Sequence, residues 1–246
     1  MDDVSITMTP PESQNLKKIV AESAVNHYVR DGMTVGLGTG STAEYAIRKV
    51  GELAASGYEL TCVATSLRTE KLAAEVGVRI SDLSDVEHID VTIDGADEVD
   101  PDLQLIKGLG GALLREKIVA AATVKEIIIV DDSKLVQKLG TRSPLPVEVV
   151  PFGHTKTKYA LEKQGCKAAL RTVGGRPFIT DSGNYVYDCV FAAIESPFFL
   201  ESRIDVIPGV VENGLFLNTA YAVLSVNGEG VVTAIGRDGT RDILTP

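Results

Sequence analysis

Short apolar runs alternate with segments of helical periodicity along the first half of the chain. The apolar runs span residues 34–37, 60–64, 78–80, 89–93 and 126–131. The segments with apolar residues at helical spacing span 15–29, 43–55, 68–75 and 111–122. Strands that alternate with helices form a parallel sheet, because each strand needs a crossover before the next one begins. We therefore predict an α/β fold with a mostly parallel, Rossmann-like sheet and helices on both faces.

The alternation ends after Gly140, where the segment RSPLPVEVVP (142–151) carries three prolines. The pattern then predicts a helix over 155–164, strands near 168–172, 178–180 and 185–192, and a short helix at 201–204. Helices and strands in this order are typical of an α+β arrangement. We predict a smaller α+β domain over 141–213, with one sheet and helices on one face.

The last part of the chain is expected to return to the first sheet. Strands are predicted over 215–218 and 220–226, and NGEGVV and RDGTRD have the composition of hairpin turns. The larger, Rossmann-like catalytic domain would then comprise 15–140 and 214–246. Residues 1–14, which are polar and contain Pro10-Pro11, are predicted to form a disordered tail.

Composition excludes several classes of partner. A formal net charge of −10 disfavours nucleic acid and anionic membrane surfaces, because like charges repel. No apolar run approaches the roughly 20 residues of a membrane span, and no signal peptide is apparent. The three cysteines and three histidines show no metal-binding spacing, so we expect reduced thiols and no zinc site. We expect a cytoplasmic protein, although a removed organellar transit peptide would leave no trace.

The segment GLGTGSTAEYAI (36–47) lies between a predicted strand and a predicted helix. Its glycines allow a tight turn, and Thr39, Ser41 and Thr42 place hydroxyls beside the N–H groups of a helix start, which favours an anion site. A plain turn capped by Ser41 is the alternative. The segment lacks the lysine of a Walker P-loop. It contains the dinucleotide fingerprint G-x-G-x-x-A, but no acidic residue ends the second strand as that fingerprint requires.

The run DGADEVDPD (94–102) places five carboxylates directly after a predicted strand. Asp94 and Asp97 should lie at the carboxyl end of the parallel sheet, where α/β folds bind their ligands. An EF-hand is excluded by the residues at the third and sixth loop positions, and a Mg²⁺ site stays open. The other three carboxylates are expected in a solvated turn: Glu98, Asp100 and Asp102.

The segment KGLGGALLREK (107–117) supplies Lys107, a glycine-rich turn, and Glu116 in the helix that follows. An exposed charged face over REK is the alternative. We favour a site, because this loop, the two loops above and Lys134 all follow strand ends of one sheet and should converge on one crevice. An anion site, carboxylates and lysines in one crevice form the outline of a sugar-phosphate pocket, with backbone N–H groups facing an oxyanion.

This chain resembles the type A ribose-5-phosphate isomerases from about Lys17 to its C-terminus. The resemblance rests on four segments that occur in the same order and at compatible spacing, namely GTGSTA, DGADE, KGLGGALLREK and PLPVEVVP. Leu109 departs from the family, in which many members carry glycine or a basic residue there. We expect that position to contribute mainly its backbone. The resemblance implies interconversion of D-ribose 5-phosphate and D-ribulose 5-phosphate, in the non-oxidative pentose phosphate pathway, without metal or organic cofactor. It also implies a homodimer or homotetramer, with the smaller domain helping assembly.

Carried over position by position, the resemblance implies that Glu116 is the base that moves a proton between C2 and C1, with Asp94 and Lys107 as further catalytic residues. The substrate-binding residues that it implies are Lys17, Thr39, Gly40, Ser41, Thr42, Asp94, Gly95, Ala96, Asp97, Lys107, Gly108, Leu109, Gly110 and Lys134. This agrees with the chemistry, because removal of a carbon proton needs a placed carboxylate and stabilisation of the enediolate oxygen.

Three other functions were compared with this one. A sugar-phosphate-sensing regulator would need a DNA-binding module, whereas only a short acidic segment precedes the first helix. An acyl-CoA transferase on a related fold would form a glutamyl thioester that hydroxylamine cleaves. A dehydrogenase would bind NADH and change its fluorescence. The isomerase accounts best for all of the segments together.

Overall fold

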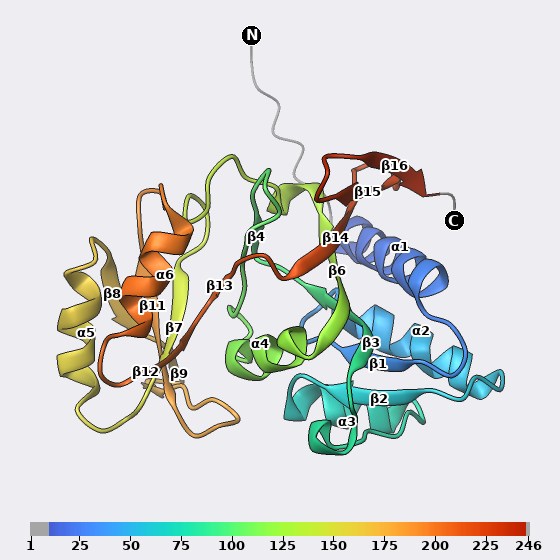
Figure 1. Cartoon of the computed structure of the whole chain (residues 1–246), viewed down its shortest axis with the longest axis horizontal. Helices are drawn as coiled ribbons and strands as arrows, with labels where there is room; N and C mark the ends of the chain where they lie inside the picture. The colour runs from blue at the N-terminus through green and yellow to red at the C-terminus, as the bar shows by residue number, and fades with distance from the viewer. Residues whose placement is uncertain (1–9, 245–246) are drawn as a thin grey trace, which may run out of the picture.

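A seven-stranded sheet forms the centre of the larger part of the protein (Figure 1). The structure is a computed structural model that describes residues 10–244. The strand order of the sheet is β16-β15-β14-β6-β3-β1-β2. The strands are β1 (Thr34–Leu37), β2 (Thr61–Ala64), β3 (Ile89–Gly95), β6 (Thr123–Asp131), β14 (Ala220–Val226), β15 (Val232–Gly236) and β16 (Arg241–Leu244). The strands from β14 to β2 pair in parallel. Strand β15 pairs antiparallel with β14, and β16 pairs antiparallel with β15. The predicted mostly parallel sheet is confirmed.

Helices cover both faces of this sheet, as expected. They are α1 (Pro10–Tyr28), α2 (Ala43–Ala55), α3 (Leu67–Glu75) and α4 (Leu113–Ala121). Residues of α1, α2 and α3 share one apolar core with Val35, Ile93 and Ile127 of the sheet. Residues of α4 share a second core with Ile128 and Val130, which point to the opposite face because side chains alternate along a strand. The sheet is therefore buried on both sides, which is why its strands are continuous apolar runs.

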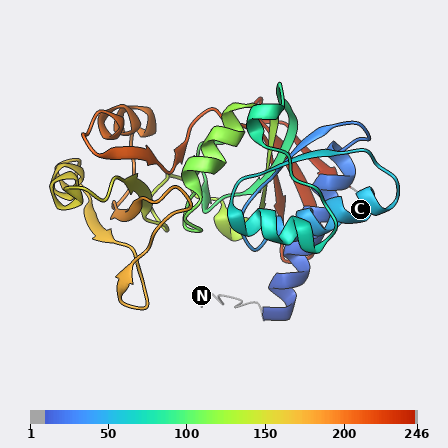
Figure 2. The same ribbon diagram turned by 90° about the horizontal axis from the view of Figure 1, so that it is seen from below.

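The smaller part of the protein has its own antiparallel sheet, with the strand order β12-β7-β11-β8. Its strands are β7 (Leu145–Val149), β8 (Lys167–Leu170), β11 (Tyr185–Val190) and β12 (Val210–Asn213), and its helices are α5 (His154–Glu162) and α6 (Pro197–Asp205). Both helices share one core with Leu145, Val147 and Val149, which lie on one face of β7. A hairpin of β9 (Thr172–Val173) and β10 (Arg176–Pro177) extends from this sheet (Figure 2). We refer to residues 145–213 as the smaller unit; the two-domain division of the chain stays a prediction.

Three short strands lie between the two parts and correct one expectation. They are β4 (Glu98–Val99), β5 (Leu105–Ile106) and β13 (Leu215–Phe216), in the order β13-β5-β4. The strand predicted over 215–218 thus does not rejoin the first sheet, because Leu215 and Phe216 pair with Ile106 and Leu105 instead. Of the two predicted strands, the second returns to the large sheet as β14, where it runs parallel to β6.

Other boundaries also differ from the predictions. The first helix begins at Pro10, five residues before the expected Asn15, so part of the predicted tail is helical, and its remaining residues 1–9 lie outside the described residues. The run at 78–80 forms a single bridge, between Ile80 and Cys62, and no strand. The strand predicted at 168–172 is interrupted at Arg171. Residues 178–180 form no strand, and the ring of Phe178 lies against Gly111 of the larger part of the protein. Two 3₁₀ turns complete the fold, η1 (Leu83–Asp85) and η2 (Asp132–Lys134).

Glu98 was expected in a solvated turn, and that prediction is wrong. Its side chain is fully buried. Its carboxylate oxygens accept hydrogen bonds from the backbone N–H groups of Gly140 (2.6 Å), Arg142 (2.6 Å) and Ser143 (2.5 Å). A carboxylate can be buried when several N–H donors satisfy it. Glu98 therefore holds the segment that leads into the smaller unit, whereas Asp102 is exposed, as expected.

This burial predicts the effect of one substitution on stability. Glu98→Gln keeps the shape of the side chain but turns an amide N–H₂ toward backbone donors, so it should lower the free energy of unfolding by about 1–3 kcal/mol. Urea denaturation measures this change. Asp102→Asn, an equivalent change on the exposed side of the same run, should stay within about 0.5 kcal/mol of the wild type. Equal effects of the two substitutions would contradict the assigned role of Glu98.

Candidate active site

The loops that follow β1, β3, β5 and β6 meet at one cavity of about 520 Å³ at the carboxyl end of the parallel sheet. It is lined by Ser13, Lys17, Thr39, Gly40, Ser41, Thr42, Ala43, Gly95, Ala96, Asp97, Lys107, Gly108, Gly110, Glu116, Ile129, Val130, Asp131, Ser133 and Lys134. All but two of the residues predicted for the site are in this set. The exceptions are Asp94, which is buried and paired with Lys107, and Leu109, whose side chain is exposed.

The loop between β1 and α2 approaches β3 closely. A Cβ on Gly38 would lie 2.2 Å from Oδ1 of Asp94, so only glycine allows this approach. The next N–H, of Thr39, donates to that oxygen (3.0 Å). The hydroxyl of Thr39 is hydrogen-bonded to Thr65 and Ser66 (2.8 and 2.7 Å), so both the N–H and the hydroxyl of Thr39 hold neighbouring loops rather than face a ligand.

The start of α2 faces the cavity without a side-chain cap. Its N-cap, Thr42, makes no capping hydrogen bond, so the alternative of a plain capped turn does not fit. The hydroxyl of Ser41 accepts a hydrogen bond from Nζ of Lys17 in α1 (3.0 Å). A helix N-terminus beside a lysine favours an anion. Lys134, after β6, brings a second half-buried ammonium to the same cavity.

A buried ion pair lies at the base of the cavity. Nζ of Lys107 is 3.0 Å from Oδ2 of Asp94 and donates to the carbonyl of Gly95 (2.5 Å). Burial alone lowers the pKa of Lys107. The carboxylates of Asp94, Glu116 and Glu126 outweigh that effect, and the pKa is raised above its ordinary value. Lys107 therefore stays positively charged, and its charge is shared among carboxylates from three different elements.

Glu116 is buried, which rejects the alternative of an exposed REK face. Its Oε2 lies 3.9 Å from Nζ of Lys107 and has no hydrogen-bond partner within the described part of the chain. Burial raises the pKa of Glu116 to about 8, with Lys107 opposing the shift and Asp94 adding to it. A buried carboxylate with a raised pKa and a free oxygen beside a cavity is equipped to accept a proton.

Asp97 and Leu109 are joined across the mouth of the cavity. The N–H of Leu109 donates to Oδ2 of Asp97 (3.0 Å), and the Leu109 side chain is 42% exposed. Leu109 thus acts through its backbone, as its unusual side chain led us to expect. Burial raises the pKa of Asp97, although this N–H and the charges of Lys107, Lys134 and Arg171 lower it.

Sequence reasoning missed three polar residues of the cavity, namely Ser13, Asp131 and Ser133. Ser13 was assigned to the tail, and only the longer α1 brings it to the site. Asp131 and Ser133 lie in the segment VDDSK beside Lys134, and their place at a strand end was the available signal. Among the residues described, no group of three or more histidine, cysteine, aspartate or glutamate side chains is arranged to hold a metal.

These features define an α/β enzyme whose site lies at the carboxyl ends of parallel strands. The family model of ribose 5-phosphate isomerase A (phosphoriboisomerase A) matches residues 61–230. The chain is 51% identical over 217 residues to ribose-5-phosphate isomerase A of Gloeobacter violaceus, covering 88% of this chain and 94% of that relative. It is 45% identical over 222 residues to the Listeria monocytogenes protein of that name, covering 90% and 98%. The chain belongs to the ribose 5-phosphate isomerase A family of aldose–ketose isomerases.

Solved structures agree with this assignment. The ribose 5-phosphate isomerase of Plasmodium falciparum superposes with a TM-score of 0.88 at 41% identity, covering 91% of this chain and 98% of that one. A D-ribose-5-phosphate isomerase in complex with phospho-erythronic acid gives a TM-score of 0.87 at 40% identity, with the same coverage. The predicted fold class and family are thus confirmed.

Proposed function

We propose that this protein interconverts D-ribose 5-phosphate and D-ribulose 5-phosphate through an enediolate, with Glu116 as the base. The observation that carries the proposal is the free Oε2 of buried Glu116, in a cavity that also holds Lys107 and an uncapped helix start. Family membership supports the substrate, since the relatives are named for ribose 5-phosphate.

The proposed reaction keeps its protons within the cavity. Glu116 removes the proton from C2 of the open-chain aldose, the C–H electron pair forms a C1–C2 double bond, and the C1 carbonyl pair moves to O1. A proton then passes from the O2 hydroxyl to O1. The O2 electron pair forms the C2 carbonyl, and the C1–C2 double-bond pair takes the proton back from Glu116 at C1, which gives the ketose. We assign stabilisation of the negative oxygen to Lys107 and the Gly110 N–H, since both residues line the cavity.

The two aspartates receive different roles in this proposal. Both oxygens of Asp94 are engaged, by Lys107 on one side and by the N–H groups of Thr39 and Gly95 on the other. Asp94 also does not line the cavity. We expected Asp94 to handle the sugar hydroxyl protons and ring opening, and we now assign it to holding Lys107. We propose that Asp97, which does line the cavity, handles those protons instead.

The phosphate is proposed to lie at the start of α2. Backbone N–H groups of Gly40 to Thr42, the Ser41 hydroxyl and the ammonium groups of Lys17 and Lys134 line that side of the cavity. Lys107, by contrast, is paired with Asp94 (3.0 Å), so the proposed phosphate ligands do not include the cation beside the base. The positive potential at the start of α2 outweighs the net charge of −10 locally.

Isomerisation is tested by supplying ribose 5-phosphate in the presence of EDTA and measuring ketose formation. The wild type should form ketose, because no proposed step uses a metal. Glu116→Gln should lose at least about 10³-fold in kcat while keeping the fold, since the amide cannot accept the C2 proton. Urea denaturation and binding of a sugar phosphate serve as the controls. Turnover by Glu116→Gln near the wild-type rate would exclude Glu116 as the base.

The same assay has an expected pH dependence. Glu116 acts in its ionised form, and its pKa is raised to about 8. Its ionised fraction, and with it kcat/KM, should therefore rise as the pH increases toward about 8 and level off above that value. A profile that is flat from about pH 6 to about pH 9 would mean that the base titrates elsewhere.

The phosphate site is tested with a pair of lysines from neighbouring turns. Lys134→Met should raise KM for ribose 5-phosphate by about 10-fold, the factor expected for one charge-assisted hydrogen bond, with a smaller change in kcat. Lys138→Met is the control, because Lys138 is paired with Glu195 outside the cavity (2.6 Å). Equal KM values for the two variants would place the phosphate elsewhere.

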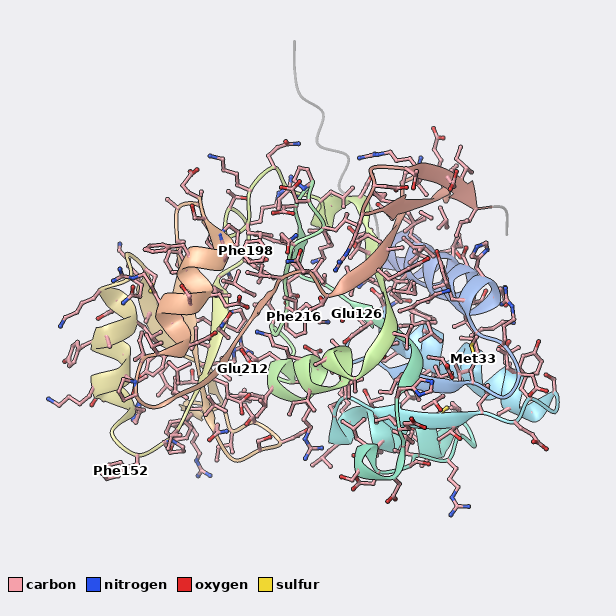
Figure 3. All side chains as sticks on the ribbon, viewed as in Figure 1. Met33, Glu126, Phe152, Phe198, Glu212 and Phe216 are labelled. Atoms are coloured by element: carbon pink, nitrogen blue, oxygen red, sulfur yellow. The ribbon has the colours of Figure 1, made fainter. Side chains whose placement is uncertain are left out.

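A cytoplasmic homo-oligomer is the proposed setting. No helix of the described residues is long and apolar enough to cross a membrane. The smaller unit exposes large apolar side chains, among them Phe152 (93%), Val206 (77%) and Phe199 (63%), and Phe152 projects from its outer edge (Figure 3). Exposed apolar groups of this size favour contact between subunits. Light scattering should therefore give the mass of a dimer or tetramer, and a monomeric mass at working concentration would contradict this.

A further inference from the structure

Arg171, in the smaller unit, reaches the glycine-rich loop of the active site. Its backbone is fixed on both sides, because its N–H donates to the carbonyl of Val186 (2.8 Å) and its carbonyl accepts from the N–H of Phe178 (2.9 Å). Its Nε donates to Oδ2 of Asp188 in β11 (3.0 Å), and its Nη2 pairs with the other oxygen. The side chain is 13% exposed. The guanidinium is thus oriented by a bidentate carboxylate, which leaves Nη1 free for another partner.

Nη1 of Arg171 donates to two carbonyls of the larger part of the protein. These belong to Gly108 (2.9 Å) and Leu109 (3.1 Å). The guanidinium also stacks on the ring of Phe178, 5.8 Å from its centroid. That ring covers Gly111, where a Cβ would lie 2.4 Å from it. Gly111 has φ +79°, a left-handed conformation that favours glycine, and the Phe178 ring leaves no room for a Cβ there. Arg171 and Phe178 together fix the loop from outside the cavity.

The first of the two peptides connects Arg171 to Asp97. The carbonyl of Gly108 and the N–H of Leu109 belong to one planar trans peptide and point in opposite directions. The carbonyl accepts from Arg171, and the N–H donates to Oδ2 of Asp97 (3.0 Å). A hydrogen-bonded chain therefore runs from Asp188 through the guanidinium and the peptide to a carboxylate of the cavity. A cation on the carbonyl polarises the peptide and strengthens its N–H as a donor.

The second peptide is held in the same way. The carbonyl of Leu109 faces Arg171, so the N–H of Gly110 is directed away from Arg171, and Gly110 lines the cavity. We propose that Arg171 is a positioning residue for the isomerisation: it fixes the two peptides between Gly108 and Gly110 so that Asp97 and the Gly110 N–H face the sugar. This inference rests on the proposed function, in which the loop stabilises the enediolate oxygen.

A purely structural role is the alternative, in which Arg171 only ties the two parts of the protein together. Arg203, which is exposed, provides a comparison within the smaller unit. Its Nε donates to Oε1 of Gln164 (2.7 Å), and its guanidinium stacks on Phe199, 5.5 Å from the centroid. Arg203 thus has a side-chain acceptor and an aromatic partner, as Arg171 does, but both partners lie within the smaller unit.

The test compares Arg171→Met with Arg203→Met at a temperature well below both unfolding midpoints. Arg171→Met should lose at least about 10-fold in kcat, with KM for ribose 5-phosphate changed by less than about threefold, because the phosphate site is untouched. Arg171→Lys should recover only part of that loss, because a single ammonium cannot bind Asp188 and both carbonyls at once. Arg203→Met should keep the wild-type kcat.

Amide hydrogen exchange of residues 107–112 provides a second readout that does not depend on turnover. Exchange of the Leu109 and Gly111 amides should become faster in Arg171→Met and stay unchanged in Arg203→Met. A wild-type kcat in a folded Arg171→Met, or unchanged exchange of this loop, would overturn the inference. If the wild type itself forms no ketose, the proposed function fails, and the exchange measurement still decides whether Arg171 holds the loop.

Discussion

The ammonium of Lys107 is buried among carboxylates, and the rest of the structure depends on how it is satisfied. Removing an ammonium from water costs several kcal/mol, which a close carboxylate must offset. Asp94 does so at 3.0 Å, and Glu116 and Glu126 add their charges. These side chains come from β3, α4 and β6, and Glu126 lies near the middle of the molecule (Figure 3). The charge is therefore balanced by side chains that only the assembled sheet, loop and helix bring together.

The sequence predicted the central sheet well and the connections between its two parts poorly. The strand at 34–37 and the helix at 43–55 have the predicted bounds, because apolar runs and flanking glycines decide them locally. Strands β5 and β13 have two residues each, which is too short for any periodicity, and they form by pairing across distant parts of the chain. Glu98 was misassigned for the same reason, since its donors follow some forty positions later.

One rule, that ligands bind at the carboxyl ends of parallel strands, predicted most of the candidate site. The carboxyl ends of parallel strands meet at one edge, which brought Gly40, Asp97, Lys107 and Lys134 to one cavity. The rule places the ends of strands but not the depth of each side chain, so it did not separate Asp97 from the more deeply buried Asp94. It is also silent on Arg171, which belongs to another sheet and touches the loop through backbone carbonyls. Such contacts leave no trace in a motif.

The geometry around Lys107 also explains how the proposed chemistry can proceed without rearrangement. An ammonium has three N–H donors. Asp94 and the carbonyl of Gly95 take two, and Glu116 lies in reach of the charge at 3.9 Å. If Glu116 is the base, proton transfer removes its negative charge at the moment when one develops on the enediolate oxygen. The anion moves from one neighbour of Lys107 to another, so the charge that the buried lysine faces stays constant. A site whose charge balance is already set in the folded protein has little left to reorganise during the reaction.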